Sequence, residues 1–262
     1  MAGIFRDNLL IGKVAYVTGG SSGIGQRMAE RLAEHGASVM IQGRNQEKLD
    51  AAVKIITDAG GKAAGVAVDV RDYAATEAAL AKCHAEFGPI DVLIAGAAGN
   101  FPAPVLGMSA NGFKAVVDID LLGTFNVCRA AHQFLTKPGA SVIAISAGQA
   151  DTPMAYQAHV CAAKAGVNLL IQSLALEWGP DGIRLNCIAP GPTADTEGMA
   201  RLAPTEAHRA KVLARVPLGR YGSKDELADL ALFLSTPASS YISGAIIPCD
   251  GGSGIAGRGL SV

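Results

Sequence analysis

Short apolar runs alternate with longer amphipathic segments along almost the whole chain. Each run is a nearly unbroken block of aliphatic residues, which is typical of strands buried on both faces of a parallel sheet. The segments between them repeat apolar residues at helical spacing. The pattern predicts strands at 14–18, 38–42, 64–69, 92–96, 141–146, 184–188 and 245–248, and helices at 25–35, 46–59, 73–87, 112–136, 156–178 and 224–235.

This alternation predicts the α/β fold class: one Rossmann-type, doubly wound domain over residues 1–262, with a seven-stranded parallel sheet and helices on both faces. No linker, repeat or low-complexity stretch interrupts it. The segment from about 190 to 217 is the one long irregular connection, rich in proline, glycine, threonine and alanine. Long connections of this kind usually serve as binding loops or lids, so we expect a substrate loop there.

Polar and glycine-rich residues follow several of the predicted strands. Open parallel sheets bind ligands outside the carboxyl ends of their strands, at the point where the strand order reverses. We therefore expect the functional site along this edge of the sheet. The edge collects the glycine-rich turn at 19–25, Arg44, Asp69, and the segments 97–101, 146–147 and 190–196.

The first predicted strand runs directly into Thr18-Gly19-Gly20-Ser21-Ser22-Gly23-Ile24-Gly25 and then into a helix. A helix N-terminus offers free N–H groups and the positive end of the helix dipole, and glycines let the backbone approach phosphates. The spacing has one residue more between its first glycines than the G-x-G-x-x-G dinucleotide fingerprint. The strand–turn–helix order favours a dinucleotide site, and we expect Gly19, Ser21, Ser22, Gly23 and Ile24 to contact the cofactor.

Arg44 indicates which dinucleotide binds. It follows the second predicted strand, where NAD-binding chains place an acidic residue on the ribose 2′-hydroxyl, and no Asp or Glu stands at this strand end. An arginine suits a 2′-phosphate by charge and geometry, so NADPH is favoured; the alternative is an ordinary exposed arginine. Asp69 ends the third predicted strand and can accept a hydrogen bond from the adenine amino group, or it is a carboxylate of a helix N-cap region.

Charge and composition bear on partners and compartment. The chain carries 22 basic and 23 acidic side chains, a net charge of −1, with no basic run, so nothing suggests nucleic acid or a membrane surface. Five widely spaced cysteines without C-x-x-C, and histidines without ligand spacing, predict free thiols and no metal site. No signal peptide or apolar run long enough for a bilayer stands out, and residues 260–262 are not Ser-Lys-Leu, so we expect a cytoplasmic protein.

Thr18–Gly25, Lys164, Asn186 and Pro190-Gly191 together resemble the short-chain dehydrogenase/reductase family, and the likeness covers essentially the whole chain. The resemblance implies an NAD(P)-dependent oxidoreductase. In that family an Asn-Ser-Tyr-Lys set transfers hydride and proton, and the lysine lowers the pKa of a tyrosine that acts as general acid.

The chain keeps only the lysine of that set. The tyrosine position, four residues before Lys164, is Val160, the serine position is Ala147 and the asparagine position is Asp120. Valine and alanine carry no proton to transfer, so carbonyl reduction by the usual relay is not available at these positions. Tyr156 lies about two helical turns before Lys164 if the helix already begins there.

One branch of the family shares this loss: the chain is most similar to the 2,4-dienoyl-CoA reductases, particularly the peroxisomal type. A departure is Ala95-Gly96, where that branch has an asparagine first. The local matches to the branch are Ala97-Ala98-Gly99-Asn100-Phe101, Asp118-Ile119-Asp120, Gly123-Thr124-Phe125-Asn126, Gln157-Ala158-His159, Glu177-Trp178-Gly179-Pro180, Ala189-Pro190-Gly191-Pro192, Thr196-Glu197-Gly198 and Asp250-Gly251-Gly252.

The resemblance implies reduction of a conjugated dienoyl thioester. Hydride reaches the far end of the conjugated chain, the electrons collect as a dienolate, and the α carbon takes a proton from a water that a carboxyl group positions. Asp120 and Asp250 resemble the branch's pair for that role, while Lys164 would hold the nicotinamide ribose and stabilise developing charge. The alternatives are a buried carboxylate bonded to backbone in a helix kink for Asp120 and a turn residue for Asp250.

Further site residues and partners follow from the same resemblance. The substrate is an acyl-CoA-like small molecule, and the helices at 112–136 and 156–178 would form a four-helix dimer contact, with the C-terminal arm completing a homotetramer. An arginine by itself is more often a solvated charge than a ligand contact. The remaining cofactor set is Arg44, Asp69, Val70, Ala97, Lys164, Pro190, Gly191 and Thr196, and the substrate set is Arg71, Phe101, Ser109, Asn111 and Arg201.

Two other functions stay open beside NADPH-dependent dienoyl-CoA reduction. A carbonyl or alcohol oxidoreductase would need a displaced acid, Tyr156 or His159. A cofactor-binding protein without catalysis would sense NADPH. The missing tyrosine and serine favour dienoyl reduction or sensing over carbonyl chemistry, and Asp120 with Arg71 and Arg201 favours dienoyl reduction over sensing.

Overall fold

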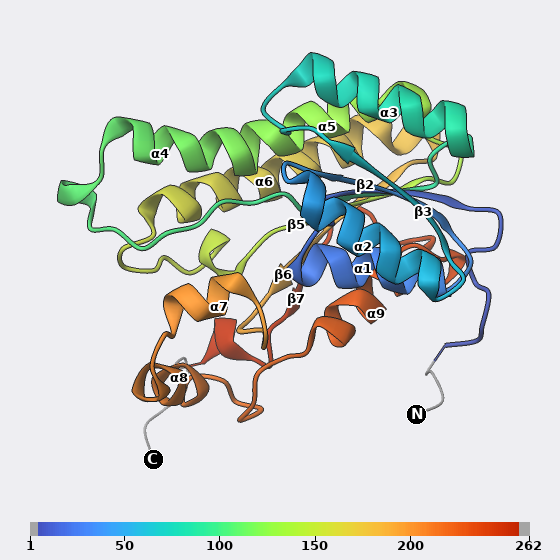
Figure 1. Ribbon diagram of the computed structural model, residues 1–262. Helices are drawn as coiled ribbons and strands as arrows, with labels where there is room; N and C mark the ends of the chain where they lie inside the picture. The colour runs from blue at the N-terminus through green and yellow to red at the C-terminus, as the bar shows by residue number, and fades with distance from the viewer. Residues whose placement is uncertain (1–4, 257–262) are drawn as a thin grey trace.

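The computed structural model describes residues 5–256; residues 260–262 and the end of the expected C-terminal arm lie outside this range. Seven strands form one parallel sheet in the order β3-β2-β1-β4-β5-β6-β7, so the strand order reverses between β1 and β4 (Figure 1). The strands are β1 Val14–Thr18, β2 Ser38–Gly43, β3 Lys62–Ala67, β4 Val92–Ala95, β5 Ser141–Ile145, β6 Arg184–Pro190 and β7 Ile246–Cys249.

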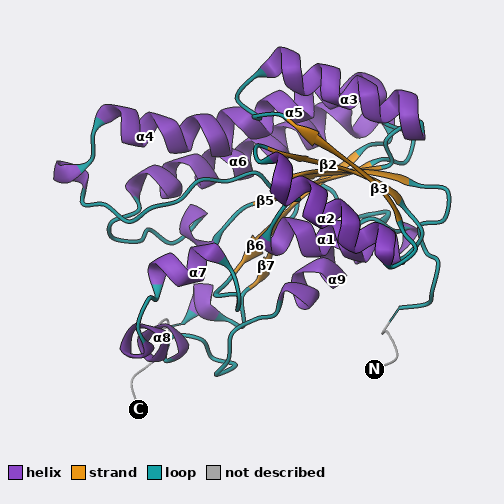
Figure 2. Cartoon of the chain, in the orientation of Figure 1, coloured by secondary structure: helices purple, strands orange, loops and turns teal. Residues whose placement is uncertain are grey.

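Helices cover both faces of the sheet, as Figure 2 shows. One face carries α1 Gly23–Glu34, α2 Gln46–Asp58 and α9 Lys224–Leu234, and the other carries α3 Tyr73–Phe87, α5 Gly123–Ala131 and α6 Ala158–Trp178. α4 Ala110–Val117 continues the line of α5 along α6, and α7 Glu197–Leu202 and α8 Glu206–Leu213 lie near the ends of β6 and β7.

Strand residues alternate between two cores. Tyr16 and Leu93 pack toward α3, α5 and α6, whereas Val17 and Ile94 pack toward α1, α2 and α9. A strand places successive side chains on opposite faces, so a strand covered on both faces is apolar at every position. This confirms the predicted fold class and the seven-stranded parallel sheet.

Two of the strands lie away from their predicted positions. β3 was expected at 64–69 but ends at Ala67, because the Asp69 carboxylate turns back to accept a hydrogen bond from the Arg71 N–H at 3.0 Å. β7 was expected at 245–248 but begins at Ile246, since the Ala245 N–H binds the Asn186 side chain at 3.0 Å. Other element ends differ by one or two residues, as helix and strand termini usually do.

The helix expected at 112–136 is four successive pieces rather than one. α4 ends at Val117, a π-helical turn spans Asp118–Leu122, α5 follows, and a 3-10 turn at His132–Phe134 ends the run. The wider turn changes which backbone groups can pair, and the Thr124 hydroxyl donates to the Asp120 carbonyl at 2.6 Å. π-helical turns inside helices occur frequently at functional sites.

The helix expected at 156–178 begins only at Ala158. Tyr156 precedes it with a φ of 66°, a left-handed backbone conformation that no helix residue adopts, and its residue surface is 62% exposed. Tyr156 is therefore not part of the helix that carries Lys164.

One stretch of the described chain, Ala158–Asp181, is long and apolar enough to cross a bilayer, although none was expected from the sequence. In this structure α6 packs against β6 and α4, and the core helices of globular proteins pass the same test of length and composition.

The connection at 190–217 was predicted to be irregular, but it contains two short helices, α7 and α8. Thr196 and Thr205 cap these two helices, accepting hydrogen bonds from the N–H groups of Met199 and His208 at 3.3 Å each. In both cases the threonine is followed by a glutamate in the first turn. That pair of residues is a recognised helix start signal in sequence, and it was overlooked because the segment is rich in proline and glycine.

Candidate active site

The carboxyl ends of β1 and β4 meet where the strand order reverses. The Thr18 hydroxyl accepts hydrogen bonds from the N–H groups of Gly96 and Ala97 at 3.1 and 3.3 Å, which ties the two strand ends together. Gly19 has a φ of 68°, and a Cβ there would lie 2.7 Å from the Gly96 carbonyl oxygen. Only glycine fits this position, so the turn can pass close under a ligand.

The N-terminus of α1 opens onto this turn. Its N-cap residue Ser22 makes no side-chain cap, and Gly23 has a φ of 60° with open space around its Cα. The first N–H groups of a helix normally find such a cap. Uncapped, with Ser21 and Ile24 beside them, they suit a diphosphate, so the chain fits a dinucleotide at this turn.

Arg44 and Asp69 lie at the outer part of the same edge. Arg44 is exposed and has no ion pair among the described residues. The Arg71 guanidinium binds Asp69 through both carboxylate oxygens, at 3.0 and 2.6 Å, and these hydrogen bonds lower the pKa of Asp69. Two residues expected to contact different ligands therefore pair with each other. Val70 beside them is buried, with its carbonyl accepting from the Asn126 amide at 2.9 Å.

Lys164 and Asp120 form a buried ion pair at the centre of the edge. The Lys164 ammonium donates to the Ile145 carbonyl at 2.8 Å and lies 3.3 Å from Asp120 Oδ2, and the two side chains are 6% and 1% exposed. Asp120 Oδ1 accepts from the Gly99 N–H at 2.7 Å. The π-helical turn thus directs this carboxylate toward both the lysine on α6 and the segment that follows β4.

No hydroxyl stands where the family carries its proton donors. Val160 is buried beside Val116 and Ala163, and Ala147 begins a short 3-10 turn after β5. Tyr156 is exposed, and its backbone carbonyl accepts from the Ala103 N–H at 2.8 Å. The site can hold and polarise a ligand, but it lacks the tyrosine relay.

Asp250 lies at the opposite wall of the site, against the end of β6. Its Oδ1 accepts from Gly252 N–H at 2.9 Å, and its Oδ2 accepts from Gly254 N–H at 2.7 Å and from the Ser253 hydroxyl at 3.3 Å. A Cβ on Gly191 would lie 2.4 Å from the Asp250 Cα, so the two strand ends are in contact. Since each carboxylate oxygen has two lone pairs, Oδ1 retains one for a further donor.

The segments that continue β6 and β4 carry the remaining cofactor residues. Pro190 ends β6 opposite Cys249, and Thr196 both caps α7 and donates to the Thr193 carbonyl at 3.0 Å. Ala97 begins the segment after β4, next to the Thr18 hydroxyl. All three therefore lie along the expected edge of the sheet.

Four of the five expected substrate residues lie on three segments, and Arg71 lies separately, between β3 and α3. Arg201 on α7 donates to the Asn100 carbonyl at 3.1 Å and so ties α7 to the segment that contains Phe101. Ser109 caps α4, and its hydroxyl accepts from the Gly112 N–H at 3.0 Å. Asn111 is exposed on the first turn of α4. These side chains are near one another, but Arg201 and Ser109 already have partners within the protein.

Asn100 and Gln157 at this edge were not predicted as site residues, and His159 was predicted only as an alternative acid. Within residues 5–256, Asn100 Oδ1, Gln157 Nε2 and both ring nitrogens of His159 are buried without a hydrogen-bond partner, and Asp120 Oδ2 has only its ion pair with Lys164. Most buried polar groups in proteins are paired, so unpaired ones point to a ligand or a strained site. Whether a buried polar atom finds a partner depends on contacts with distant parts of the chain, and the sequence carries no periodic signal for that.

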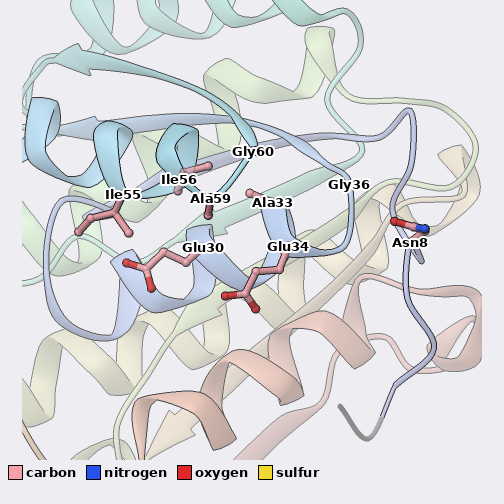
Figure 3. A pocket seen from close by; sticks show the side chains of 10 residues that line it. Asn8, Glu30, Ala33, Glu34, Gly36, Ile55, Ile56, Ala59 and Gly60 are labelled. Atoms are coloured by element: carbon pink, nitrogen blue, oxygen red, sulfur yellow. The ribbon is translucent and has the colours of Figure 1, made fainter. Parts of the chain in front are cut away.

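The molecule is also hollowed away from this edge. A hollow of about 260 Å³ lies between α1, α2 and the segment around Asn8, lined by Glu30, Glu34, Ile55 and Gly60 among others. Figure 3 shows these side chains. Both glutamates are bound by Arg27, which leaves this hollow without a free charged group. Among the described residues, no group of three or more His, Cys, Asp or Glu side chains could hold a metal ion.

Comparisons with known proteins place the chain. Residues 19–254 match the family model described as enoyl-(acyl carrier protein) reductase. The peroxisomal 2,4-dienoyl-CoA reductase of Danio rerio, named as (3E)-enoyl-CoA-producing, is 41% identical over 251 residues, covering 95% of this chain and 84% of that protein. A probable 2,4-dienoyl-CoA reductase of Bacillus subtilis, named as (2E)-enoyl-CoA-producing, is 42% identical and covers 92% and 96%.

Solved structures agree with this placement. A dehydrogenase/reductase from Sinorhizobium meliloti superposes with a TM-score of 0.88 at 33% identity, covering 93% of this chain and 96% of that one. A citronellol catabolism dehydrogenase from Pseudomonas aeruginosa gives 0.85 at 34% identity, covering 97% and 100%. The chain therefore belongs to the short-chain dehydrogenase/reductase family of NAD(P)-dependent oxidoreductases, and within it to the group of the 2,4-dienoyl-CoA reductases.

Proposed function

We propose that this protein reduces a 2,4-dienoyl-CoA, with NADPH as the cofactor, as a step in fatty acid metabolism. The observation that carries the proposal is the buried Lys164–Asp120 pair beside Val160 and Ala147. Such a site keeps charge to stabilise a negative intermediate and has no phenol to protonate an oxygen. That combination suits protonation at carbon.

The chain's own groups suit NADPH at the edge of the sheet. The turn from Gly19 to Ile24 would hold the diphosphate, and Arg44, which has no ion pair, would bind the 2′-phosphate. Lys164 would hold the nicotinamide ribose. When bound, the cofactor supplies the hydride. Asp69, Val70, Ala97, Pro190, Gly191 and Thr196 complete the proposed contacts.

Two carboxylates would supply the proton through water. Asp120 Oδ2 has Lys164 as its ion-pair partner at 3.3 Å and accepts no other hydrogen bond among the described residues, and Asp250 Oδ1 retains one lone pair. A water held by these oxygens can give a proton to the α carbon of the substrate and draw a replacement from solvent. Lys164, 3.3 Å from Asp120, stabilises the carboxylates while the proton moves.

The substrate's coenzyme A would lie across the outer edge. Arg71 and Arg201 would bind its phosphates, exchanging their present partners, and both side chains are about half exposed. Phe101, Ser109 and Asn111 would contact the rest of the thioester. The arrangement fits an acyl-CoA because cations and an aromatic ring lie on adjacent segments.

We further propose a homotetramer in which α4, α5 and α6 form the main contact. These helices expose large apolar side chains: Phe125 is 40% exposed, Leu169 66% and Leu176 82%. Exposed apolar residues gathered on neighbouring helices mark interaction surfaces. Sedimentation at several protein concentrations tests the assembly.

The activity is tested by following NADPH consumption with three substrates. We expect turnover of a 2,4-dienoyl-CoA and little or none of a 3-ketoacyl-CoA or a simple ketone. Ketone turnover would instead establish a carbonyl reductase with a displaced acid. Tight NADPH binding without turnover of any of the three would establish a cofactor-binding protein, and either result would reject the proposal.

A further inference from the structure

Two side chains at the start of α6 are buried with hydrogen-bonding capacity unused. His159 is fully buried and neither of its ring nitrogens has a partner among the described residues, while Gln157 is 1% exposed and its Nε2 has none there either. Leaving such a group unpaired destabilises the fold. Hydrogen bonds to a bound ligand would offset this loss.

Both side chains are held in fixed orientations. The His159 ring packs on Phe101 with ring centroids 4.5 Å apart and an interplanar angle of 53°. Gln149 donates to Gln157 Oε1 at 2.9 Å, which fixes the amide and leaves its NH₂ group free to donate. A neutral imidazole also offers one N–H, so two preorganised donors stand two positions apart at the start of α6.

The N-terminus of α6 lies at the same place. This helix has 21 residues, and its N-cap, Gln157, makes no side-chain cap. A helix N-terminus carries the equivalent of about half a positive charge, which favours an anion close to it. The side-chain donors and the helix end therefore favour the same sign of charge.

The proposed reaction also places negative charge on the thioester oxygen, which needs hydrogen-bond donors of its own beside the charge of Lys164. When hydride reaches the far carbon of the dienoyl chain, its electron pair moves through the conjugated system to the thioester oxygen. The hydroxyls that would bind this oxygen are absent at Ala147 and Val160, and Lys164 already donates to the Ile145 carbonyl and pairs with Asp120.

We infer that His159 and Gln157, at the N-terminal turn of α6, form the oxyanion site of this reaction and donate hydrogen bonds to the substrate's thioester oxygen. The inference rests on the proposed function. The donors release no proton: the dienolate forms as hydride adds, and it collapses when the α carbon takes a proton from the water held by Asp120 and Asp250. The oxygen is bound more strongly as its charge grows, which is the condition for faster chemistry.

The test uses His159→Phe, which keeps the ring packing against Phe101 and removes both nitrogens. The first readout is the infrared stretch of a ¹³C-labelled thioester carbonyl in bound 2,4-dienoyl-CoA, measured without NADPH. We expect the wild type to shift this band to lower frequency than in water and the variant to lose most of the shift. With NADPH, kcat should fall about 100-fold, as for loss of one oxyanion donor, and KM should change less.

Companion variants separate this role from a structural one. His84→Phe is the matched control, because His84 also packs on a phenylalanine, at 5.6 Å, but is exposed on α3. It should leave both readouts unchanged. Replacing an unpaired buried polar group by an apolar one of similar shape costs little, so His159→Phe should unfold at the wild-type temperature or above it. His159→Gln restores a donor and should recover part of the carbonyl shift and of kcat.

The outcomes distinguish the two hypotheses. A wild type that turns over 2,4-dienoyl-CoA while His159→Phe keeps the carbonyl frequency and kcat within about threefold overturns the oxyanion site alone. A wild type that shows turnover but no carbonyl shift does the same. A wild type that does not turn over this substrate overturns the proposed function, and the oxyanion site falls with it.

Discussion

The β1–α1 turn and the start of α6 both follow strands of the sheet, and they are built differently. In the turn, Gly19 meets a steric demand that only glycine satisfies, and the Thr18 hydroxyl is paired with two N–H groups. At the start of α6, His159 and Gln157 are buried with donors unpaired. The turn follows from the steric requirements of its backbone, whereas the start of α6 leaves buried side-chain donors unpaired.

This difference separates binding from chemistry. A phosphate site needs available backbone N–H groups and room, which the uncapped start of α1 and its glycines provide. A site that stabilises charge during a reaction needs donors and carboxylates held ready before the ligand arrives, and these destabilise the ligand-free fold. The comparison predicts that substitutions near α6 change rate, whereas substitutions at the cofactor end change affinity.

The largest effect is expected from Asp120→Asn. The amide keeps the shape of the side chain and an acceptor for the Gly99 N–H, but it cannot hold water as a carboxylate does. Turnover of 2,4-dienoyl-CoA should fall by about 10²–10⁴-fold, the usual range for losing acid–base catalysis. NADPH affinity, measured by fluorescence titration, should stay within about twofold.

Asp118→Asn is the matched control for that variant. Asp118 lies in the same π-helical turn, but it is partly exposed and pairs with Lys114 on the surface. Its replacement should leave turnover unchanged. Wild-type turnover in Asp120→Asn would remove the carboxylate from the mechanism and leave Asp120 as a residue that only holds the Gly99 segment.

A smaller effect, on affinity alone, is expected at Arg44. Arg44→Asp replaces a cation by an anion that repels a 2′-phosphate and can accept from a 2′-hydroxyl. NADPH affinity should fall by about 10–100-fold, the loss of one hydrogen bond to a charged group, while NADH affinity holds or rises. Lys54→Asp on α2, where Lys54 pairs with the exposed Asp58, is the control and should change neither. Equal losses for both cofactors would contradict a 2′-phosphate contact at Arg44.

The sequence predicted most of what the cofactor end contains, because each feature there is local. The glycine spacing, the strand before it and Arg44 after the second strand all lie within about one βα unit, and the apolar runs gave the sheet. The positions of Lys164 and Asp120 were predicted as well, but from the family resemblance.

The start of α6 could not be predicted in the same way. Whether Tyr156 belonged to the helix depended on a positive φ, and the burial of His159 involves Phe101, 58 positions earlier. The π-helical turn at Asp118–Leu122 likewise leaves the apolar pattern almost unchanged while it redirects Asp120. α7 and α8 are a different case, since their capping threonines were visible.

The smallest effect tests a part of the fold that obeys its local rules, the start of α9. Glu226 and Ser223 form a capping box, and Arg220 binds Glu226 at 2.6 Å; Arg220 and the Ser223 N–H together lower the Glu226 pKa to about 2. Because the folded pKa lies below the unfolded value of about 4.3, this stabilisation is present above that pH and is lost as the pH falls toward 2.

Glu226→Ala should lower the free energy of unfolding by about 1 kcal/mol at neutral pH, the size of a helix cap, since the pair with Arg220 is half exposed and adds little. Urea unfolding should show this difference shrinking below about pH 4, with Glu226→Gln, which can keep the cap, nearer to the wild type. Unlike the changes beside α6, Glu226→Ala should leave dienoyl reduction and NADPH affinity unchanged. A loss of stability that does not depend on pH would mean that the carboxylate charge plays no part in the cap.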